Sequence, residues 1–228
     1  MDATRVNIVM LGAPGAGKGT QAVRLAASLG LPHISTGDML RDGIRTGLPV
    51  ALVAKARIDR GELVDDETMI AIVGDRLNRP DTARGAVLDG FPRTVSQARA
   101  LDGLAEREAI GPLVVVELAV PEPVLVSRLA ARRVCAACGK NHEPGPGVDT
   151  RCQHCGGSLV QRQDDHEDVV RDRLAVYARS TRPLLEFYRG RPVFGTVNGH
   201  QDMTSVSRDL QTLVQTLAAN AAFVGAGQ

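Results

Sequence analysis

The chain has 228 residues and carries 27 lysines and arginines against 26 aspartates and glutamates, a net charge of +1. This balance gives no overall attraction for nucleic acid or for an anionic membrane. No apolar run approaches the roughly 20 residues that span a bilayer, and the first residues lack the apolar segment of a secretory signal. We expect a cytoplasmic protein with one α/β domain that carries insertions, or one domain plus a small module.

A glycine-rich loop at residues 12–20 follows an apolar run at 6–11, which we predict to be a strand. Glycines let successive backbone N–H groups face one concavity that holds phosphate oxygens, and Lys18 adds a positive charge there. Helical spacing after the loop places a helix N-terminus at the same anion. A glycine-rich turn that only caps a strand is the alternative. The residues expected to hold phosphates are Gly15, Ala16, Gly17, Lys18, Gly19 and Thr20.

The loop departs from the usual phosphate-binding motif at one position. The motif places Ser or Thr directly after the lysine, whereas this chain has Gly19 there and Thr20 one residue later. The shift indicates that a magnesium ion is reached differently than in common GTPases. It favours a small nucleotide kinase.

Strands and helices are predicted to alternate along the rest of the chain. Further strands are expected at residues 33–34, 86–89, 113–118 and 193–197. Apolar spacing predicts helices at residues 69–77, 165–189 and 206–217. Pro183 is expected to kink or break the second of these. The order predicts an α/β fold, a parallel sheet with helices on both faces. Residues 35–64 and 131–165 do not fit the alternation and are expected to be insertions near the ligand.

Asp89 ends the strand predicted at 86–89, at a sheet edge next to the phosphate-binding loop. A carboxylate in this place can hold a magnesium ion through water. An aspartate that caps a turn or a helix is the alternative.

All four cysteines lie in the second insertion, in two pairs that each enclose two residues: Cys135 with Cys138 and Cys152 with Cys155. Two such pairs can place four thiolates tetrahedrally around zinc, in a closed structural site. Disulfides are the alternative, and the expected cytoplasmic location argues against them. His142 and His154 are within reach as substitute ligands, although four thiolates are already available. Zinc would replace the apolar core that so small a lobe cannot build.

Four arginines flank the same insertion. Arg128 and Arg132 lie four residues apart, on one face of a predicted helix. Arg162 and Arg173 flank the start of the helix on the other side. All four could converge on a polyphosphate when the insertion closes, and phosphoryl transfer needs mainly positioning and charge stabilisation. A solvated, arginine-rich helix face is the alternative.

Several motifs together resemble those of the adenylate kinase family, in its long form with a zinc-binding lid. They are GAPGAGKGT at 12–20, STGDMLR at 35–41, LDGFPRT at 88–94, the two CxxC pairs, and RxDD at 162–165 with Arg173 beyond. The resemblance covers nearly the whole chain. It implies the nucleoside monophosphate kinase fold and reversible phosphoryl transfer from ATP to AMP, giving two ADP, with catalytic Mg²⁺ and structural Zn²⁺. It also implies a core at 1–34, 65–130 and 166–228, an AMP-binding insertion at 35–64 and a lid at 131–165.

The resemblance assigns residues to the two nucleotides. On the ATP side it implies the phosphate-binding loop, Arg128 and Arg132, with Asn141, His142 and Gln201 near the adenine. On the AMP side it implies Thr36, Arg41, Glu62, Leu63, Val64, Gly90, Phe91, Pro92, Arg93, Gln97, Arg162 and Arg173. The catalytic residues would be Lys18, Asp89, Arg93, Arg128, Arg162 and Arg173, and Asp164 and Asp165 would orient the lid arginines.

The lid departs from the family pattern in two places. Zinc-lid relatives carry a small polar residue followed by an aromatic one where this chain has Asn141 and His142. The pattern therefore does not specify how the lid contacts adenine. The loop at 140–151 is short and includes Pro144 and Pro146, which we expect to stiffen the lid tip.

A second possible function is a phosphate-binding-loop module whose zinc ribbon binds nucleic acid. That function needs exposed basic and aromatic residues around the cysteines. Residues 135–155 contain Lys140 and Arg151 but no Phe, Tyr or Trp, which favours the kinase. We expect ATP and AMP as partners, with no nucleic acid and no membrane. We also expect a monomer, because two moving insertions need free space.

Overall fold

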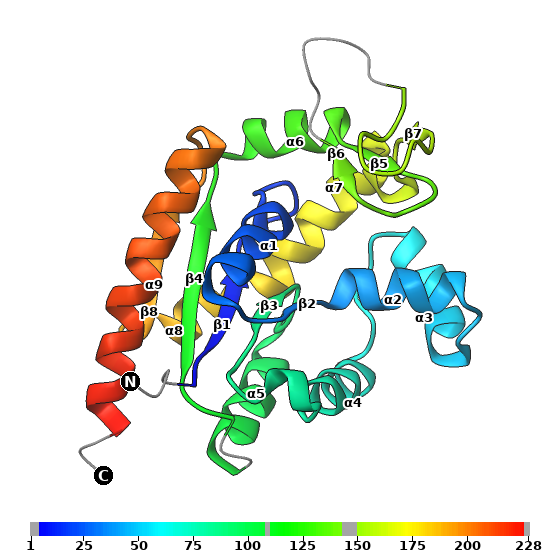
Figure 1. Cartoon of the computed structure of the whole chain (residues 1–228). Helices are drawn as coiled ribbons and strands as arrows, with labels where there is room; N and C mark the ends of the chain where they lie inside the picture. The colour runs from blue at the N-terminus through cyan, green and yellow to red at the C-terminus, as the bar shows by residue number, and fades with distance from the viewer. Residues whose placement is uncertain (1–4, 108–109, 143–149, 226–228) are drawn as a thin grey trace.

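The structure is a computed structural model in which residues 5–107, 110–142 and 150–225 are described. Its centre is a parallel sheet with strand order β2-β3-β1-β4-β8 (Figure 1). The strands are β1 (Asn7–Leu11), β2 (His33–Ser35), β3 (Val87–Asp89), β4 (Leu113–Ala119) and β8 (Phe194–Asn198). Each predicted strand is therefore confirmed, to within one residue at either end.

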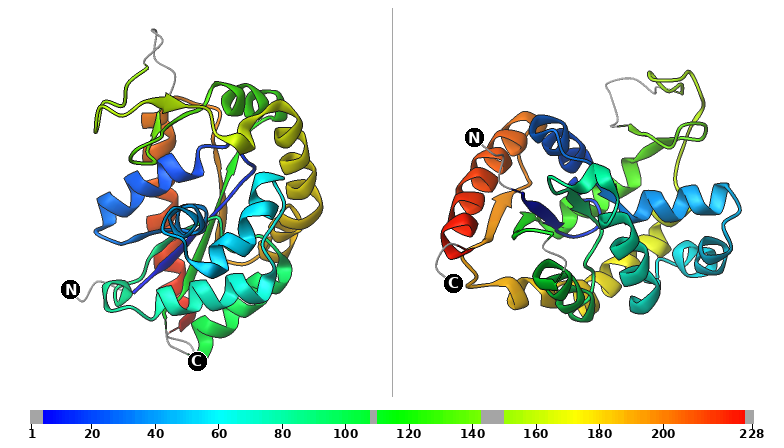
Figure 2. Two further views of the ribbon diagram at one scale, coloured as in Figure 1. Left: turned by 90° about the vertical axis from the view of Figure 1, so that its right-hand side faces the viewer. Right: turned by 60° about the horizontal axis from the view of Figure 1, so that its bottom comes forward.

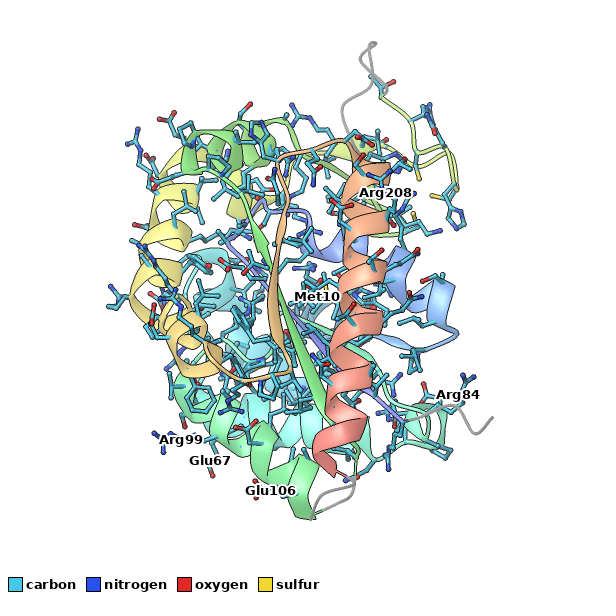
Figure 3. All side chains as sticks on the ribbon, turned by 90° about the vertical axis from the view of Figure 1, so that its left-hand side faces the viewer. Met10, Glu67, Arg84, Arg99, Glu106 and Arg208 are labelled. Atoms are coloured by element: carbon cyan, nitrogen blue, oxygen red, sulfur yellow. The ribbon has the colours of Figure 1, made fainter. Side chains whose placement is uncertain are left out.

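Strand β1 shows why this sheet needs helices on both faces. Successive side chains of a strand point to opposite sides, and every residue of β1 is buried. Ile8 and Met10 pack into one hydrophobic cluster, whereas Val9 and Leu11 pack into another. In Figure 3, Met10 lies inside the molecule and Glu106 lies at its edge. The continuous apolar run thus specifies a strand that is covered twice.

Helices cover both faces of the sheet (Figure 2). The cluster around Ile8 includes side chains of α1 (Lys18–Leu29), α6 (Glu122–Ala131) and α9 (Met203–Gly225). The cluster around Val9 includes side chains of α4 (Asp66–Leu77), α5 (Val95–Arg107) and α8 (Pro183–Tyr188). The predicted α/β fold is confirmed. Within the described ranges, no helix is both long and apolar enough to span a bilayer.

Local sequence sets the ends of these helices. The Asp65 carboxylate accepts a hydrogen bond from the Thr68 N–H at 2.9 Å and so caps the start of α4. Gly30, in the left-handed conformation, ends α1 and donates its N–H back into the last turn. A short 3-10 helix, Pro80–Thr82, leads from α4 toward β3.

The helix predicted at 165–189 is interrupted. It consists of α7 (Glu167–Val176), a π-helical turn (Tyr177–Thr181) and α8, and it follows a 3-10 turn (Gln163–Asp165). Pro183 is the first residue of α8. Because proline has no N–H and its ring crowds the preceding turn, regular α-helical bonding gives way just before it. The predicted break at Pro183 is confirmed.

The two insertions project on the same side of the molecule (Figure 1). Residues 35–64 contain α2 (Thr36–Arg45) and α3 (Pro49–Asp59). Residues 131–165, the lid, contain a separate antiparallel sheet with strand order β6-β5-β7. Its strands are β5 (Arg133–Cys135), β6 (Asn141–His142) and β7 (Leu159–Val160). Pro144 and Pro146 lie outside the described residues.

Candidate active site

The phosphate-binding loop connects β1 to α1. Gly15 and Gly17 adopt φ angles of +84° and +94°, a region that residues with a Cβ rarely enter. A Cβ on Gly15 would also lie 2.9 Å from the Leu125 carbonyl oxygen. Gly17 is the N-cap of α1, so the next three residues have N–H groups without partners inside the helix. The loop has the backbone geometry of an anion site.

Lys18 folds back over this loop. Its Nζ donates hydrogen bonds to the carbonyl oxygens of Gly12 at 2.7 Å and Ala13 at 2.9 Å. Burial lowers the pKa of Lys18 to about 8; Asp89 opposes this effect, and repulsion from three guanidiniums adds to it. These guanidiniums belong to Arg93, Arg132 and Arg173. Bound phosphates would neutralise the excess of positive charge around Lys18.

Asp89, at the end of β3, lies beside the start of α1. Its Oδ2 is 3.7 Å from Nε2 of His33. Burial alone would raise the pKa of Asp89, but the His33 imidazole and the Lys18 ammonium hold it below its ordinary value. A Cβ on Gly19 would lie 3.2 Å from Asp89 Oδ2. The glycine that follows Lys18 therefore leaves room for the carboxylate, which gives a physical reason for the departure from the usual motif.

A cavity lies against the 35–64 insertion and the end of β3. It is lined by residues expected on the AMP side: Thr36, Arg41, Glu62, Leu63, Val64, Gly90, Arg93, Gln97 and Arg173. Leu40, Ile58 and Met69 add an apolar wall. A cavity with an apolar wall and a few polar groups suits a nucleotide base and its phosphate.

Hydrogen bonds fix the polar groups around this cavity. Thr36 Oγ1 donates to the Gly90 carbonyl oxygen at 2.9 Å, and Arg93 Nε donates to the same oxygen at 2.8 Å. The Gln97 Oε1 accepts from the Arg93 N–H at 2.7 Å, and its Nε2 donates to Asp66 Oδ1 at 2.7 Å. The orientation of the buried Gln97 amide is therefore set before a ligand binds.

Phe91 and Pro92 do not line the cavity, although the resemblance placed them on the AMP side. The Phe91 side chain is 1% exposed and packs in the same cluster as Leu88. The Phe91–Pro92 peptide bond is cis. A large apolar ring gains more from burial in the core than from a polar site, so the Phe91 side chain faces the core rather than the cavity.

Two arginines share one buried carboxylate at the base of the lid. Asp165 is 1% exposed. It accepts hydrogen bonds from Arg132 Nε at 2.6 Å and from Arg173 Nη1 at 2.8 Å. Arg173 also pairs with Asp164 at 3.1 Å. A buried carboxylate between two guanidiniums orients both of them.

Arg128 lies in the last turn of α6, and Arg132 caps the end of this helix. Arg128 Nη2 donates to the Gly199 carbonyl oxygen at 3.1 Å, and its Nη1 lies 3.5 Å from the Ala16 oxygen of the phosphate-binding loop. Helix α6 ends at Ala131, and Arg132 has an extended backbone, with φ −61° and ψ 135°. The predicted helix therefore contains Arg128 and ends one residue before Arg132, because β5 starts at the next residue.

The other expected site residues lie at the edges of the site. Arg162 Nη2 donates to Asn141 Oδ1 at 2.7 Å, and Arg162 lines a second cleft together with Arg41. Gln201 Nε2 donates to the Asn198 carbonyl oxygen at 2.9 Å and to Asp209 Oδ2 at 3.0 Å. His142 lies against the cysteine cluster rather than this cleft.

The four cysteine sulfurs form one cluster in the lid. All four Sγ atoms lie within 4.8 Å of one another, at 3.4 Å for Cys135 and Cys155 and 3.7 Å for Cys138 and Cys152. Thiolates bound to zinc at about 2.3 Å in a tetrahedron are about 3.8 Å apart, so the cluster fits a zinc ion. The Cys138 N–H bonds to Cys135 Sγ and lowers the pKa of that thiol to about 6. All four thiols are free of disulfides.

Comparison with known proteins agrees with this geometry. The sequence profile of adenylate kinases matches residues 10–193. The chain belongs to the adenylate kinase family. An adenylate kinase of Archaeoglobus fulgidus is 42% identical over 215 residues, which cover 93% of this chain and 99% of the relative. An adenylate kinase of Bacillus subtilis is 45% identical over 215 residues, with 92% and 98% covered. The chain is thus a nucleoside monophosphate kinase that converts ATP and AMP to two ADP.

Some residues of the adenylate kinase site carry no ligand signal in the sequence. Asp66 fixes the Gln97 amide and His33 lies beside Asp89. In the sequence, Asp66 is an acidic residue in the first turn of a helix, where its negative charge interacts favourably with the helix dipole. Met69 belongs to the apolar stripe of the same helix. Both patterns indicate helix formation and packing, so neither points to the cavity.

Proposed function

We propose that this chain transfers the terminal phosphoryl group of ATP to AMP by in-line displacement, with Mg²⁺ and converging arginines under a closing lid. The observation that supports this most is that Arg128 Nη1 lies 3.5 Å from the Ala16 oxygen of the phosphate-binding loop, while Arg93 and Arg173 line the cavity. These arginines come from separate segments, and Arg173 shares the Asp165 carboxylate with Arg132 at the base of the lid. When two nucleotides lie end to end, positively charged side chains are needed around the transferring phosphoryl group to stabilise its negative charge.

ATP would occupy the phosphate-binding loop. The backbone N–H groups of residues 15–20 and the Lys18 ammonium would hold its phosphates, and Arg128 and Arg132 would contact them from the lid hinge. Gln201 would lie near the adenine. Bound phosphates would raise the lowered pKa of Lys18 toward its ordinary value, because they place negative charge beside the ammonium.

AMP would occupy the cavity beside the 35–64 insertion. Thr36, Gln97 and the backbone at 62–64 would hold the nucleoside. Arg41 and Arg93 would bind its phosphate. Arg162 and Arg173 would contact the transferring group from the lid side, since both lie at the base of the lid. Always charged, planar guanidiniums suit this task.

Asp89 is the residue proposed to hold a magnesium ion, through water. Its pKa is held below the ordinary value, and it lies beside the first turn of α1, where Thr20 offers a hydroxyl. Carboxylate, hydroxyl and water oxygens are the ligands that Mg²⁺ prefers. When bound, the ion neutralises charge on the phosphate oxygens.

Gly19→Ala is expected to shift the Asp89 carboxylate by a few tenths of an ångström and to lower kcat about tenfold, with a higher Mg²⁺ requirement. Steady-state rates over a range of Mg²⁺ concentrations measure both effects. Gly74→Ala is the matched control, because Gly74 lies in α4 and a Cβ there would meet Leu104 only at 4.0 Å. Wild-type kcat and Mg²⁺ dependence in Gly19→Ala would contradict this role of Gly19.

The lid would hold a structural zinc through its four cysteines and would close over the bound nucleotides. Closure would exclude water and so suppress ATP hydrolysis, and reopening would limit turnover. We further propose that the enzyme works as a monomer, because the two insertions that flank the cavity need space to move. We also propose that it works in the cytoplasm.

AMP is expected to be the preferred acceptor by about a hundredfold in kcat/KM, because buried hydrogen-bonding groups such as Gln97 discriminate strongly between bases. The measurement is ADP formation from ATP with AMP, GMP, CMP or UMP in a coupled assay. Gln97→Ala should reduce the preference without abolishing transfer. Higher kcat/KM with UMP or CMP than with AMP would refute the proposed acceptor.

A further inference from the structure

Strand β6 carries two adjacent side chains that reach different parts of the molecule. Asn141 Oδ1 accepts a hydrogen bond from Arg162 Nη2 at 2.7 Å. His142 Nε2 lies 3.2 Å from Cys152 Sγ, in the cysteine cluster. Neighbouring side chains of a strand point to opposite sides. This short strand therefore links the cysteine cluster to Arg162.

Asn141 is the residue that holds the Arg162 side chain. Among the described residues, this is the hydrogen bond that the Arg162 guanidinium makes, whereas Arg132 and Arg173 are both ion-paired with Asp165. Burial lowers the pKa of Arg162 to about 10, and repulsion from Arg41 and Arg132 adds to this effect, whereas Asp164 and Asp165 oppose it. A guanidinium among charges of both signs keeps one orientation only if an acceptor fixes it.

A neutral amide suits this task better than a carboxylate would. A hydrogen bond to a neutral acceptor is weaker than one to an anion, and it leaves the positive charge of the arginine uncompensated. A phosphate group can therefore take over the guanidinium when it arrives. A carboxylate in the same place would compete with the phosphate.

We propose that Asn141 is a positioning residue that presents Arg162 to the transferring phosphoryl group. The proposal rests on the role in transfer proposed above for Arg162. Asn141 stands where the family pattern has a residue that contacts adenine, and its side-chain oxygen accepts the hydrogen bond of Arg162. Because His142 Nε2 contacts Cys152 Sγ, β6 is also joined to the cysteine cluster, which would keep the strand in place.

The test compares Asn141→Ala with Asn141→Gln. Asn141→Ala is expected to lower kcat about tenfold, with KM for ATP changed by less than about twofold and the preference for ATP over GTP unchanged. Asn141→Gln keeps an amide acceptor and is expected to recover most of kcat. Asn141 is exposed, so the melting temperature should not move. The exposed neighbour Lys140 gives the matched control, and Lys140→Ala should behave as wild type.

Arg162→Ala separates this inference from the proposed function. It is expected to lower kcat by about 10²-fold or more, and Asn141→Ala added to it should have no further effect. Wild-type kcat in Arg162→Ala would contradict the proposed function itself. If Arg162→Ala is impaired, then full kcat in Asn141→Ala, or additive losses in the double variant, would overturn only the role of Asn141. A higher KM for ATP in Asn141→Ala, together with a weaker preference for ATP over GTP, would also overturn the role of Asn141, since these changes indicate an adenine contact.

Discussion

Lys18→Met is expected to lower kcat/KM for ATP by about 10³-fold. Methionine keeps the length of the side chain but removes the ammonium that bonds to the Gly12 and Ala13 carbonyl oxygens. Those oxygens would then face the phosphates without a cation between them. The loss should appear mainly in kcat, because charge on the transferring group is greatest in the transition state.

Lys140→Met is the control, since it removes a lysine from an exposed position of the lid. It should keep wild-type kcat/KM. Thermal melting of both variants separates loss of catalysis from loss of folding, and Lys18→Met should melt no earlier than wild type because a partly buried charge with a lowered pKa is removed. A folded Lys18→Met enzyme within about tenfold of wild-type activity would refute the role of this lysine.

Removal of the lid metal, or replacement of all four cysteines by serine, is expected to lower the melting temperature by about 10 °C, at 2–4 °C per kcal/mol for a chain of this size. In the described part of the lid, the buried residues are Cys135, Cys152 and Asp165. So small a core cannot hold three short strands together without the metal. Phosphoryl transfer should remain measurable at low temperature, because the sulfurs form a closed site with no open position for chemistry.

Metal analysis of the purified protein should give about one zinc per chain, as expected for one four-thiolate site. Calorimetry with and without a chelator then measures the shift in melting temperature. The four-serine variant is the control for the chelator, which should leave its melting temperature unchanged. Complete loss of transfer in a folded, metal-free protein would show that the metal does more than stabilise the lid.

The sheet and the phosphate-binding loop could be predicted because their signals are local. The apolar run at 113–118 needs no distant partner to be recognised as a strand buried on both faces. The conformations of Gly15 and Gly17 follow from the lack of a Cβ. The cysteine spacing likewise specifies a four-thiolate cluster before any fold is known.

The remaining features depend on contacts between distant segments. Asp66 fixes Gln97 across 31 positions of the chain, and nothing near either residue indicates the pair. Helix α6 ends before Arg132 because a lid strand follows it, and the helical spacing of the arginines does not indicate this end. The Phe91 ring is buried in the core, in a position that depends on residues from other segments. The hydrogen bond between Arg162 and Asn141 forms only when the lid is folded.

The most direct test is a crystal structure with a bisubstrate analogue, two adenosines joined by a chain of five phosphates. We predict one adenosine beside the phosphate-binding loop and the other in the cavity with Thr36 and Gln97. The lid should be closed, with the guanidiniums of Arg93, Arg128, Arg132, Arg162 and Arg173 within hydrogen-bond distance of phosphate oxygens. Arginines that still face solvent around a fully bound analogue, with no phosphate contact, would contradict the account.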